Sequence, residues 1–278
     1  MVPMLQRSLP LVVASLLPLA LAGPARAQPP AVTPEVAESW NAVVRNLRAC
    51  KDQKKAGQDD AALKSVDQAV AAANKLPAGS EKLWLSIARA YRDLGAVTLA
   101  EKALPKAGAT PDTESTRAFI RHDRRSYGLF PSAGIPPESE PAFVATYDRL
   151  FAALNAKKLS RSDLQAALAK YPQAPALKMI DCDAQLRANH RKQAEPLCES
   201  AIAAAPELAR AHYLMGLARN QAGKKDEAVT YLRKSIDLDA EDPGVWQALG
   251  DVYRKSGKRQ ELAGLSAAYQ KKFGNPLQ

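Results

Sequence analysis

The sequence is poor in the residues that build catalytic and metal centres. Its 278 residues include three cysteines and three histidines, and the three histidines are widely separated along the chain. It contains no Cys-x-x-Cys pair, no His-Glu-x-x-His motif and no Gly-x-Ser-x-Gly motif. The Gly-Lys pairs at Gly223 and Gly257 lack the rest of a phosphate-binding loop. These absences argue against an enzyme, and we predict no cofactor and no bound metal.

Residues that favour β-sheet are also scarce. Aromatic residues make up 6% of the chain, and β-branched residues are scattered, whereas strands favour both kinds. Alanine, the strongest helix former, is abundant. The composition therefore predicts an all-α fold.

A long apolar run occurs near the N-terminus, from about Leu9 to Ala22, and Ala25-Arg26-Ala27 follows it. The run is interrupted by proline and is shorter than the roughly 20 residues that span a bilayer. We predict a cleavable signal peptide over 1–27, cut after Ala27, and a Pro-rich linker over 28–34. The mature protein would then be periplasmic or secreted, with no stable membrane anchor.

The charge is unbalanced toward the basic side. Lysine and arginine total 39 against 29 acidic residues, for a formal net charge of +10. A basic cytosolic protein would suggest nucleic acid as a partner, but an exported protein meets anionic envelope polymers, lipid head groups and acidic proteins instead. We therefore expect no nucleic-acid partner.

A 34-residue period organises the C-terminal part of the chain. The rows are 175–208, 209–242 and 243–276. Aligned, they share a column of small residues, Cys182, Gly216 and Gly250, and a column of turn residues, Asn189, Gly223 and Gly257. Each row contains two amphipathic helical stretches that the turn column separates. Glycine suits the left-handed end of a helix, and small residues let two helices pack closely. The rows therefore predict helix pairs.

This pattern resembles the tetratricopeptide repeat family. The resemblance rests on the period, on the spacing of Gly216, Gly223, Ala228 and Pro206, and on Trp246, Leu249, Gly250 and Tyr253 in the last row. It implies a right-handed superhelical solenoid of antiparallel helix pairs. The first row departs from the pattern, because Lys178 and Asp181 occupy positions of large apolar residues and Pro196 falls inside the second helix.

The same spacing continues more weakly upstream. It predicts helical hairpins over 35–107, where Pro105 ends one helix early, and another pair over 141–171, so that the C-terminal solenoid spans 141–278. About six helix pairs result. Between them, over 108–140, the period fails, and we expect an irregular, basic and Pro-rich insertion whose first part can form a short helix that carries its arginines.

The insertion contains a candidate basic patch of four arginines, Arg117, Arg121, Arg124 and Arg125. In one interpretation it binds an acidic or aromatic ligand, with Tyr127 and Phe130 as anchors. In the other it is a linker, with Phe119, Tyr127 and Phe130 packed against the helices and the arginines solvated. The sequence leaves both open.

The resemblance also implies a function. The first helices of such repeats line a groove that holds a peptide or a helix, and the columns that face it are Met179, Asp183, Leu186, Tyr213, Leu217, Asn220, Gln247, Asp251 and Arg254. The lysines and asparagines with which one subgroup clamps a C-terminal carboxylate are missing. We expect an exported scaffold that binds a protein or peptide partner in cell-envelope assembly. The alternative is a binder of peptidoglycan or lipopolysaccharide through the 117–125 block.

Two cysteines flank a histidine in the first row. Cys182 and Cys198 are equally far from the turn at His190, so they lie at one level of an antiparallel hairpin, about 12 Å from that turn at 1.5 Å per residue. This distance disfavours a metal site and a Cys-His catalytic pair. A disulfide in an oxidising compartment and two buried free thiols remain as alternatives, and Cys50 stays unpaired in either case.

Overall fold

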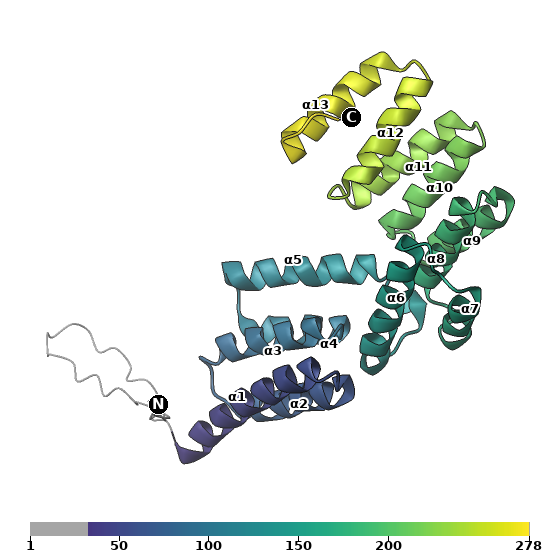
Figure 1. Ribbon diagram of the computed structural model, residues 1–278. Helices are drawn as coiled ribbons and strands as arrows, with labels where there is room; N and C mark the ends of the chain where they lie inside the picture. The colour runs from purple at the N-terminus through teal and green to yellow at the C-terminus, as the bar shows by residue number, and fades with distance from the viewer. Residues whose placement is uncertain (1–32, 278) are drawn as a thin grey trace, which may run out of the picture. The chain divides into compact units, whose positions relative to one another are not determined.

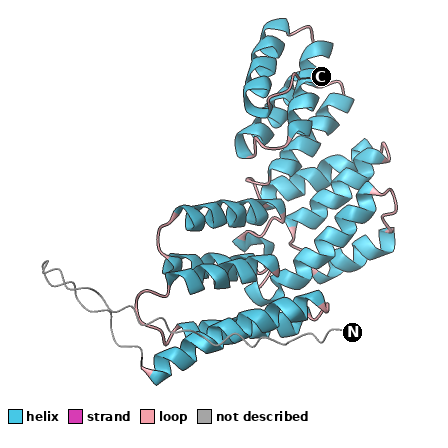
Figure 2. Ribbon diagram, turned by 60° about the vertical axis from the view of Figure 1, so that its left-hand side comes forward, coloured by secondary structure: helices cyan, strands magenta, loops and turns pink. Residues whose placement is uncertain are grey.

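The computed structural model describes residues 33–277, and its regular elements within that range are all helical (Figures 1 and 2). The α-helices are α1 (Pro34–Lys55), α2 (Asp59–Ala73), α3 (Glu81–Asp93), α4 (Val97–Ala103), α5 (Pro111–Ser126), α6 (Glu140–Asn155), α7 (Arg161–Lys170), α8 (Pro175–Arg187), α9 (Arg191–Ala204), α10 (Ala209–Gln221), α11 (Lys225–Leu238), α12 (Pro243–Lys255) and α13 (Arg259–Phe273). Short 3-10 turns lie at Leu104–Ala107, Pro131–Ala133 and Pro137–Ser139. The predicted all-α fold is confirmed.

The α-helices other than α5 form six consecutive pairs, which begin at α1, α3, α6, α8, α10 and α12. This is the number of pairs that the sequence predicts. The three C-terminal rows coincide with α8–α9, α10–α11 and α12–α13. None of the helices within residues 33–277 is both long and apolar enough to cross a membrane.

One left-handed residue makes the turn inside each pair. The six residues and their φ angles are Gly57 (71°), Gly95 (78°), Lys157 (57°), Asn189 (60°), Gly223 (77°) and Gly257 (68°). Glycine adopts this conformation at no steric cost, whereas other residues pay about 1–2 kcal/mol, asparagine less than most. The predicted turn column is therefore confirmed, and its reason is the backbone conformation that the turn requires.

The small-residue column marks where the two helices of a pair approach most closely. A Cβ added at Gly216 would lie 2.7 Å from Cγ of Leu232, which is itself fully buried. In the preceding pair the same two columns hold Cys182 and Cys198, whose sulfurs are joined at a Cα–Cα distance of 5.5 Å. A disulfide thus replaces the contact between a glycine and a leucine, and Cys50 is free and buried.

The first row accommodates its unusual residues in different ways. Asp181 is 3% exposed, and it accepts hydrogen bonds from Arg161 on α7 at 2.5 Å and from Gln185 at 3.2 Å. Pro196 lies inside α9, which continues through it although proline offers no N–H to the carbonyl four residues earlier. The row keeps its helices because buried ion pairing and the disulfide compensate locally.

The expected irregular insertion is shorter than 108–140. Its first half is the 16-residue helix α5, which Thr110 caps by accepting a hydrogen bond from the Thr113 amide at 3.2 Å. Pro111 occupies the first turn, where a missing N–H costs nothing. The irregular backbone is confined to about 127–139. The short helix expected at the start of the insertion is therefore present and longer than expected, and the irregular part coincides with the proline-rich segment.

Candidate functional site: a pocket at the end of helix α5

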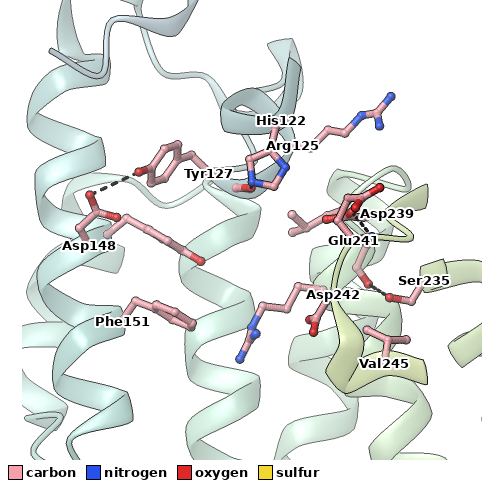
Figure 3. Close-up of a pocket in the computed structure, with 15 residues that line it drawn as sticks. His122, Arg125, Tyr127, Asp148, Phe151, Ser235, Asp239, Glu241, Asp242 and Val245 are labelled. Atoms are coloured by element: carbon pink, nitrogen blue, oxygen red, sulfur yellow. Dashed lines mark hydrogen bonds between the residues drawn. The ribbon is translucent and has the colours of Figure 1, made fainter. Parts of the chain in front are cut away.

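A pocket of about 400 Å³ opens where the C-terminal end of α5 meets α6 and the ends of α10, α11 and α12. Figure 3 shows the residues that line it. Tyr127, Asp148 and Phe151 stand on one side, and Asp239, Glu241, Asp242 and Val245 stand on the other. The pocket therefore combines an aromatic wall with an acidic wall.

The aromatic wall is a stack of three rings. Tyr147 and Phe151, one helical turn apart on α6, lie nearly parallel with centroids 5.8 Å apart. Tyr127, just after α5, meets the Tyr147 ring edge-on at 5.4 Å. Tyr147 is 6% exposed, and within residues 33–277 its hydroxyl has no hydrogen-bond partner. Burial raises the pKa of that hydroxyl, so it stays protonated and can both donate and accept.

The acidic wall comes from the loop between α11 and α12. Asp242 caps α12 by accepting a hydrogen bond from the Gly244 amide at 2.8 Å, and Asp239 accepts from the Glu241 amide at 3.0 Å. Glu241 forms an ion pair with Lys272 at 2.6 Å. Local turn and cap geometry thus fixes the carboxylates of Asp239 and Asp242 in place.

Asp148 completes the ring of acids from the aromatic side. The Tyr127 hydroxyl donates to its Oδ2 at 3.4 Å. Burial raises the pKa of the Asp148 carboxyl, and burial together with the nearby carboxylates of Asp148 and Asp123 raises the pKa of Tyr127 to about 12.

The cations at the pocket are engaged elsewhere. Arg210 donates to Asp183 at 2.8 Å and stacks over the Phe151 ring, 4.8 Å from its centroid. Arg125 donates to the backbone carbonyl of Leu238 at 3.3 Å. No cation among residues 33–277 forms an ion pair with Asp148, Asp239 or Asp242. The pocket consequently carries an excess of negative charge.

The predicted groove residues do not line this pocket. Met179, Asp183 and Leu186 are buried, with exposures of 1%, 5% and 6%, because α6 and α10 both pack on α8. Asp183 is held by Arg187 and Arg210. Their prediction as binding residues is corrected, since they offer a partner almost no surface.

The remaining groove candidates retain some exposed surface. Tyr213, Leu217, Asn220 and Gln247 are half-buried, whereas Asp251 and Arg254 are exposed and form an ion pair with each other. A binding role for these six stays a prediction.

The four arginines of α5 do not form one basic surface. Arg117 pairs with Glu114, and Arg124 turns inward to the carbonyl of Leu129 and to Glu101. Arg125 reaches the pocket. Arg121 is exposed and has no ion pair within the described part of the chain. The predicted basic patch is corrected, because contacts with acidic side chains or backbone carbonyls engage three of the four guanidinium groups, although the spacing places all four arginines on one face of α5.

The aromatic residues of the predicted insertion over 108–140 differ in their burial. Tyr127 and Phe130 pack against the core, as the linker interpretation predicts. Phe119 does not, because it is 52% exposed, and the Arg92 guanidinium lies over its ring, 4.8 Å from the centroid.

Sequence reasoning missed the pocket. Glu241 and Asp242 form an acidic pair just before a predicted helix, but acids at this position commonly stabilise the helix through its dipole. Nothing in the sequence pattern places them near Tyr147 and Asp148, more than 90 residues earlier. Within residues 33–277 no three His, Cys, Asp or Glu side chains come close enough together to hold a metal ion.

Comparison with known proteins identifies one repeat directly. The sequence model of the tetratricopeptide repeat matches residues 209–242, which is the middle row of the predicted period and comprises α10 and α11. No curated protein matches the chain.

Several solved structures are similar to parts of it. MamA from Desulfovibrio magneticus RS-1 is 21% identical over 69% of this chain and 94% of its own, with a TM-score of 0.37. PilW, described as a widely conserved type IV pilus biogenesis factor, is 16% identical over 84% and 94%, with a TM-score of 0.39. The tetratricopeptide repeat protein TTC0263 from Thermus thermophilus is 16% identical over 84% and 92%, with a TM-score of 0.37. These scores are too low to support an argument about function.

The sequence model therefore identifies residues 209–242 as a tetratricopeptide repeat, and the helix pairs α8–α9 and α12–α13 on either side of it continue the same register.

Proposed function

We propose that the chain is a protein-binding scaffold and that the pocket at the end of α5 holds a segment of a partner protein. The observation that carries this proposal is the pocket itself. Its walls come from five helices and their loops, and they combine aromatic surface, carboxylates without an ion-pair partner among the described residues and the hydroxyl of Tyr147, which has no hydrogen-bond partner there either. Binding sites typically combine apolar walls with a few fixed polar groups in this way.

A site-specific photo-crosslinker tests the position of the partner. It would replace Ser126, which lines the pocket, or Gln165, which is exposed on α7 away from it. We expect the same defined partner to be captured strongly from Ser126 and weakly from Gln165. Equal capture from both positions would place the binding surface elsewhere.

Export to the bacterial periplasm, with a role in envelope assembly, is part of the proposal. Two features support it, the N-terminal pattern of the sequence and the Cys182–Cys198 disulfide, since disulfides persist in oxidising compartments. The signal peptide over 1–27 and most of the 28–34 linker lie outside the described residues. Mass measurement of the protein from its own cells should give a chain that begins at Gln28, and an intact N-terminus would refute cleavage.

The alternative, an anionic envelope polymer bound by α5, has less support. Arg124 is already paired with Glu101, and Arg117 with Glu114. Exposed and without an ion pair in the described range, Arg121 is the best remaining contact. If this alternative holds, Arg121→Glu should abolish polymer binding, and that binding should fall steeply with salt. Reversal of Arg124 would be a poor test, because it would disrupt the contact between α4 and α5.

A further inference from the structure

We infer that the pocket at the end of α5 receives a basic side chain of the partner, arginine in particular, with an apolar residue beside it. This inference rests on the proposed function, because it names the chemistry of the segment that the scaffold binds. It is argued from the charge, the hydrogen-bonding capacity and the apolar walls of the pocket.

The carboxylates of the pocket outnumber its cations. Asp239 and Asp242 line the cavity from the α11–α12 loop, and Asp148, whose carboxylate points to the Tyr127 hydroxyl, lines it from α6 (Figure 3). Arg125 also lines the pocket, and it donates to the backbone carbonyl of Leu238. Arg210 and Glu241, which also line the pocket, are already paired with Asp183 and Lys272. Complementary charge guides association and sets specificity, so a partner with a cation at this position is favoured and one with an anion is rejected.

An independent observation points to the same kind of ligand. Tyr147 is only 6% exposed and lines the pocket, yet its hydroxyl makes no hydrogen bond to any described residue. The hydroxyl oxygen is not among the fully buried unpaired polar atoms of the described chain, so it is open to the pocket and available to a ligand. A bound N–H donor would use this hydroxyl as an acceptor and would leave the nearby carboxylates as charge partners.

The pocket favours a guanidinium over an ammonium. A guanidinium is planar, has five N–H donors and stacks on aromatic rings, so it can bind a carboxylate or hydroxyl acceptor while it packs against a ring. Arg210 shows this arrangement at the same place, because it stacks on Phe151 while it binds Asp183. The neighbouring surface of Leu208, Ala209 and Val245 is apolar and suits an aliphatic residue next to the arginine.

Four matched peptides test the inference on the purified protein. The first is acetyl-Ala-Leu-Arg-Leu-Ala-amide, and the others carry lysine, citrulline or glutamate in place of arginine. Citrulline keeps the shape of arginine but removes the charge. By calorimetric titration we expect the arginine peptide to bind most tightly, citrulline about tenfold more weakly, and glutamate not at all.

Pocket variants connect the binding to the named residues. Asp239→Asn with Asp242→Asn should remove the preference for arginine over citrulline, and asparagine keeps the helix cap at position 242. Tyr147→Phe should weaken the arginine peptide about fivefold, the loss of one hydrogen bond. Asp237→Asn, on α11 but outside this pocket, is the matched control and should change nothing.

Three outcomes overturn the inference. The first is equal affinity for the arginine and citrulline peptides. The second is no binding of the arginine peptide up to about 1 mM, a very weak affinity. The third is a preference for arginine that survives in the double variant. If any of them occurs while the crosslinker at Ser126 still captures a partner, the cation subsite is refuted and the scaffold stands. If the crosslinker also fails, the proposed function fails with it.

Discussion

Two buried carboxylates flank one half of the disulfide on α8. Asp181 and Asp183, on either side of Cys182, are both almost fully buried, and each is held by arginine from another helix. A buried charge that loses its partner is strongly destabilising. These arginines therefore connect α8 to α7 and α10, and they explain why acids are tolerated at two buried positions, Asp181, where the repeat has a large apolar residue, and Asp183, where a binding role was predicted.

A buried histidine makes stability depend on pH. His212 donates from Nε2 to the Pro206 carbonyl at 2.8 Å, and burial lowers its pKa from the ordinary value of 6.5, with a smaller contribution from Lys234. The unfolded chain therefore takes up the proton at a higher pH than the folded chain. Stability from this residue is fully present above pH 6.5 and is lost as pH falls below it.

Urea unfolding at about pH 7.5 and 5.5, on either side of the ordinary histidine pKa, checks this prediction. His212→Gln keeps a donor to the same carbonyl but cannot titrate, so its loss of stability on acidification should be smaller than that of the original protein. Buried acids such as Glu140 and Asp148 have raised pKa values and act in the opposite direction, which is why the two proteins must be compared. An identical acid response would rule out His212 as the cause.

The disulfide predicts a defined thiol count. Cys50 is free, and Cys182 and Cys198 are joined. Alkylation in denaturant should modify one thiol per chain without reductant and three after reduction, as read by mass. Three modified thiols without reductant would contradict the disulfide. Its reduction should lower the free energy of unfolding by about 3 kcal/mol, because it closes a loop of this length in the unfolded chain.

At the scale of secondary-structure elements, the stability of a helix pair depends on the position where its two helices approach most closely. In α10–α11 that contact is Gly216 against the fully buried Leu232, and in α8–α9 the disulfide takes its place. A side chain at Gly216 would overlap an atom that has no room to move. The glycine is therefore required by packing between helices, although it is unfavourable for the helix that contains it.

Two helical glycines separate these effects. Gly216→Ala should destabilise the protein by about 1–3 kcal/mol, because overpacking exceeds the gain in helix propensity. Gly264→Ala on α13 has nothing within 4 Å of the added Cβ and should stabilise by about 0.5–1 kcal/mol. Thermal and urea unfolding of both variants measure this. A gain of stability in both would show that α10 and α11 do not pack as closely as described.

At the scale of the whole described chain, the apolar core consists of two clusters that divide near the C-terminal end. One continuous cluster extends from Val43 to Ala218, and a second, smaller one joins α11 to α12 through residues such as Leu232 and Tyr253. The last helix, α13, buries only Tyr269, which contacts Trp246 and Phe273. In repeat proteins each unit is stabilised mainly by its neighbours, and α12–α13 has a neighbouring pair on one side.

We therefore expect α12 and α13 to open before the rest of the solenoid. Hydrogen exchange followed by mass spectrometry should give amides in α13 at least tenfold less protection than those in α8 and α10, which corresponds to about 1.4 kcal/mol. Equal protection throughout would indicate that the described helices unfold as one cooperative unit.

Much of the architecture could be predicted from the sequence because it is local. The period, the left-handed turns at Asn189, Gly223 and Gly257, and the facing pair Cys182 and Cys198 all follow from interactions within one hairpin. Each repeat forms similar internal contacts, so the pattern is visible in the chain. The cap of α5 is also a local feature, but α5 has no partner helix in the 34-residue pattern, so the repeat period does not indicate it.

Only the tertiary structure decided which surfaces remain available. Met179, Asp183 and Leu186 have the periodicity of groove residues, yet packing of α6 and α10 buries them. Tyr147 and Asp242 show no pattern in common, yet they line one pocket. The physical reason is that burial and charge in a pocket depend on which distant helices meet there. The sequence by itself therefore determined the repeat, whereas the contacts between repeats determined the candidate binding site.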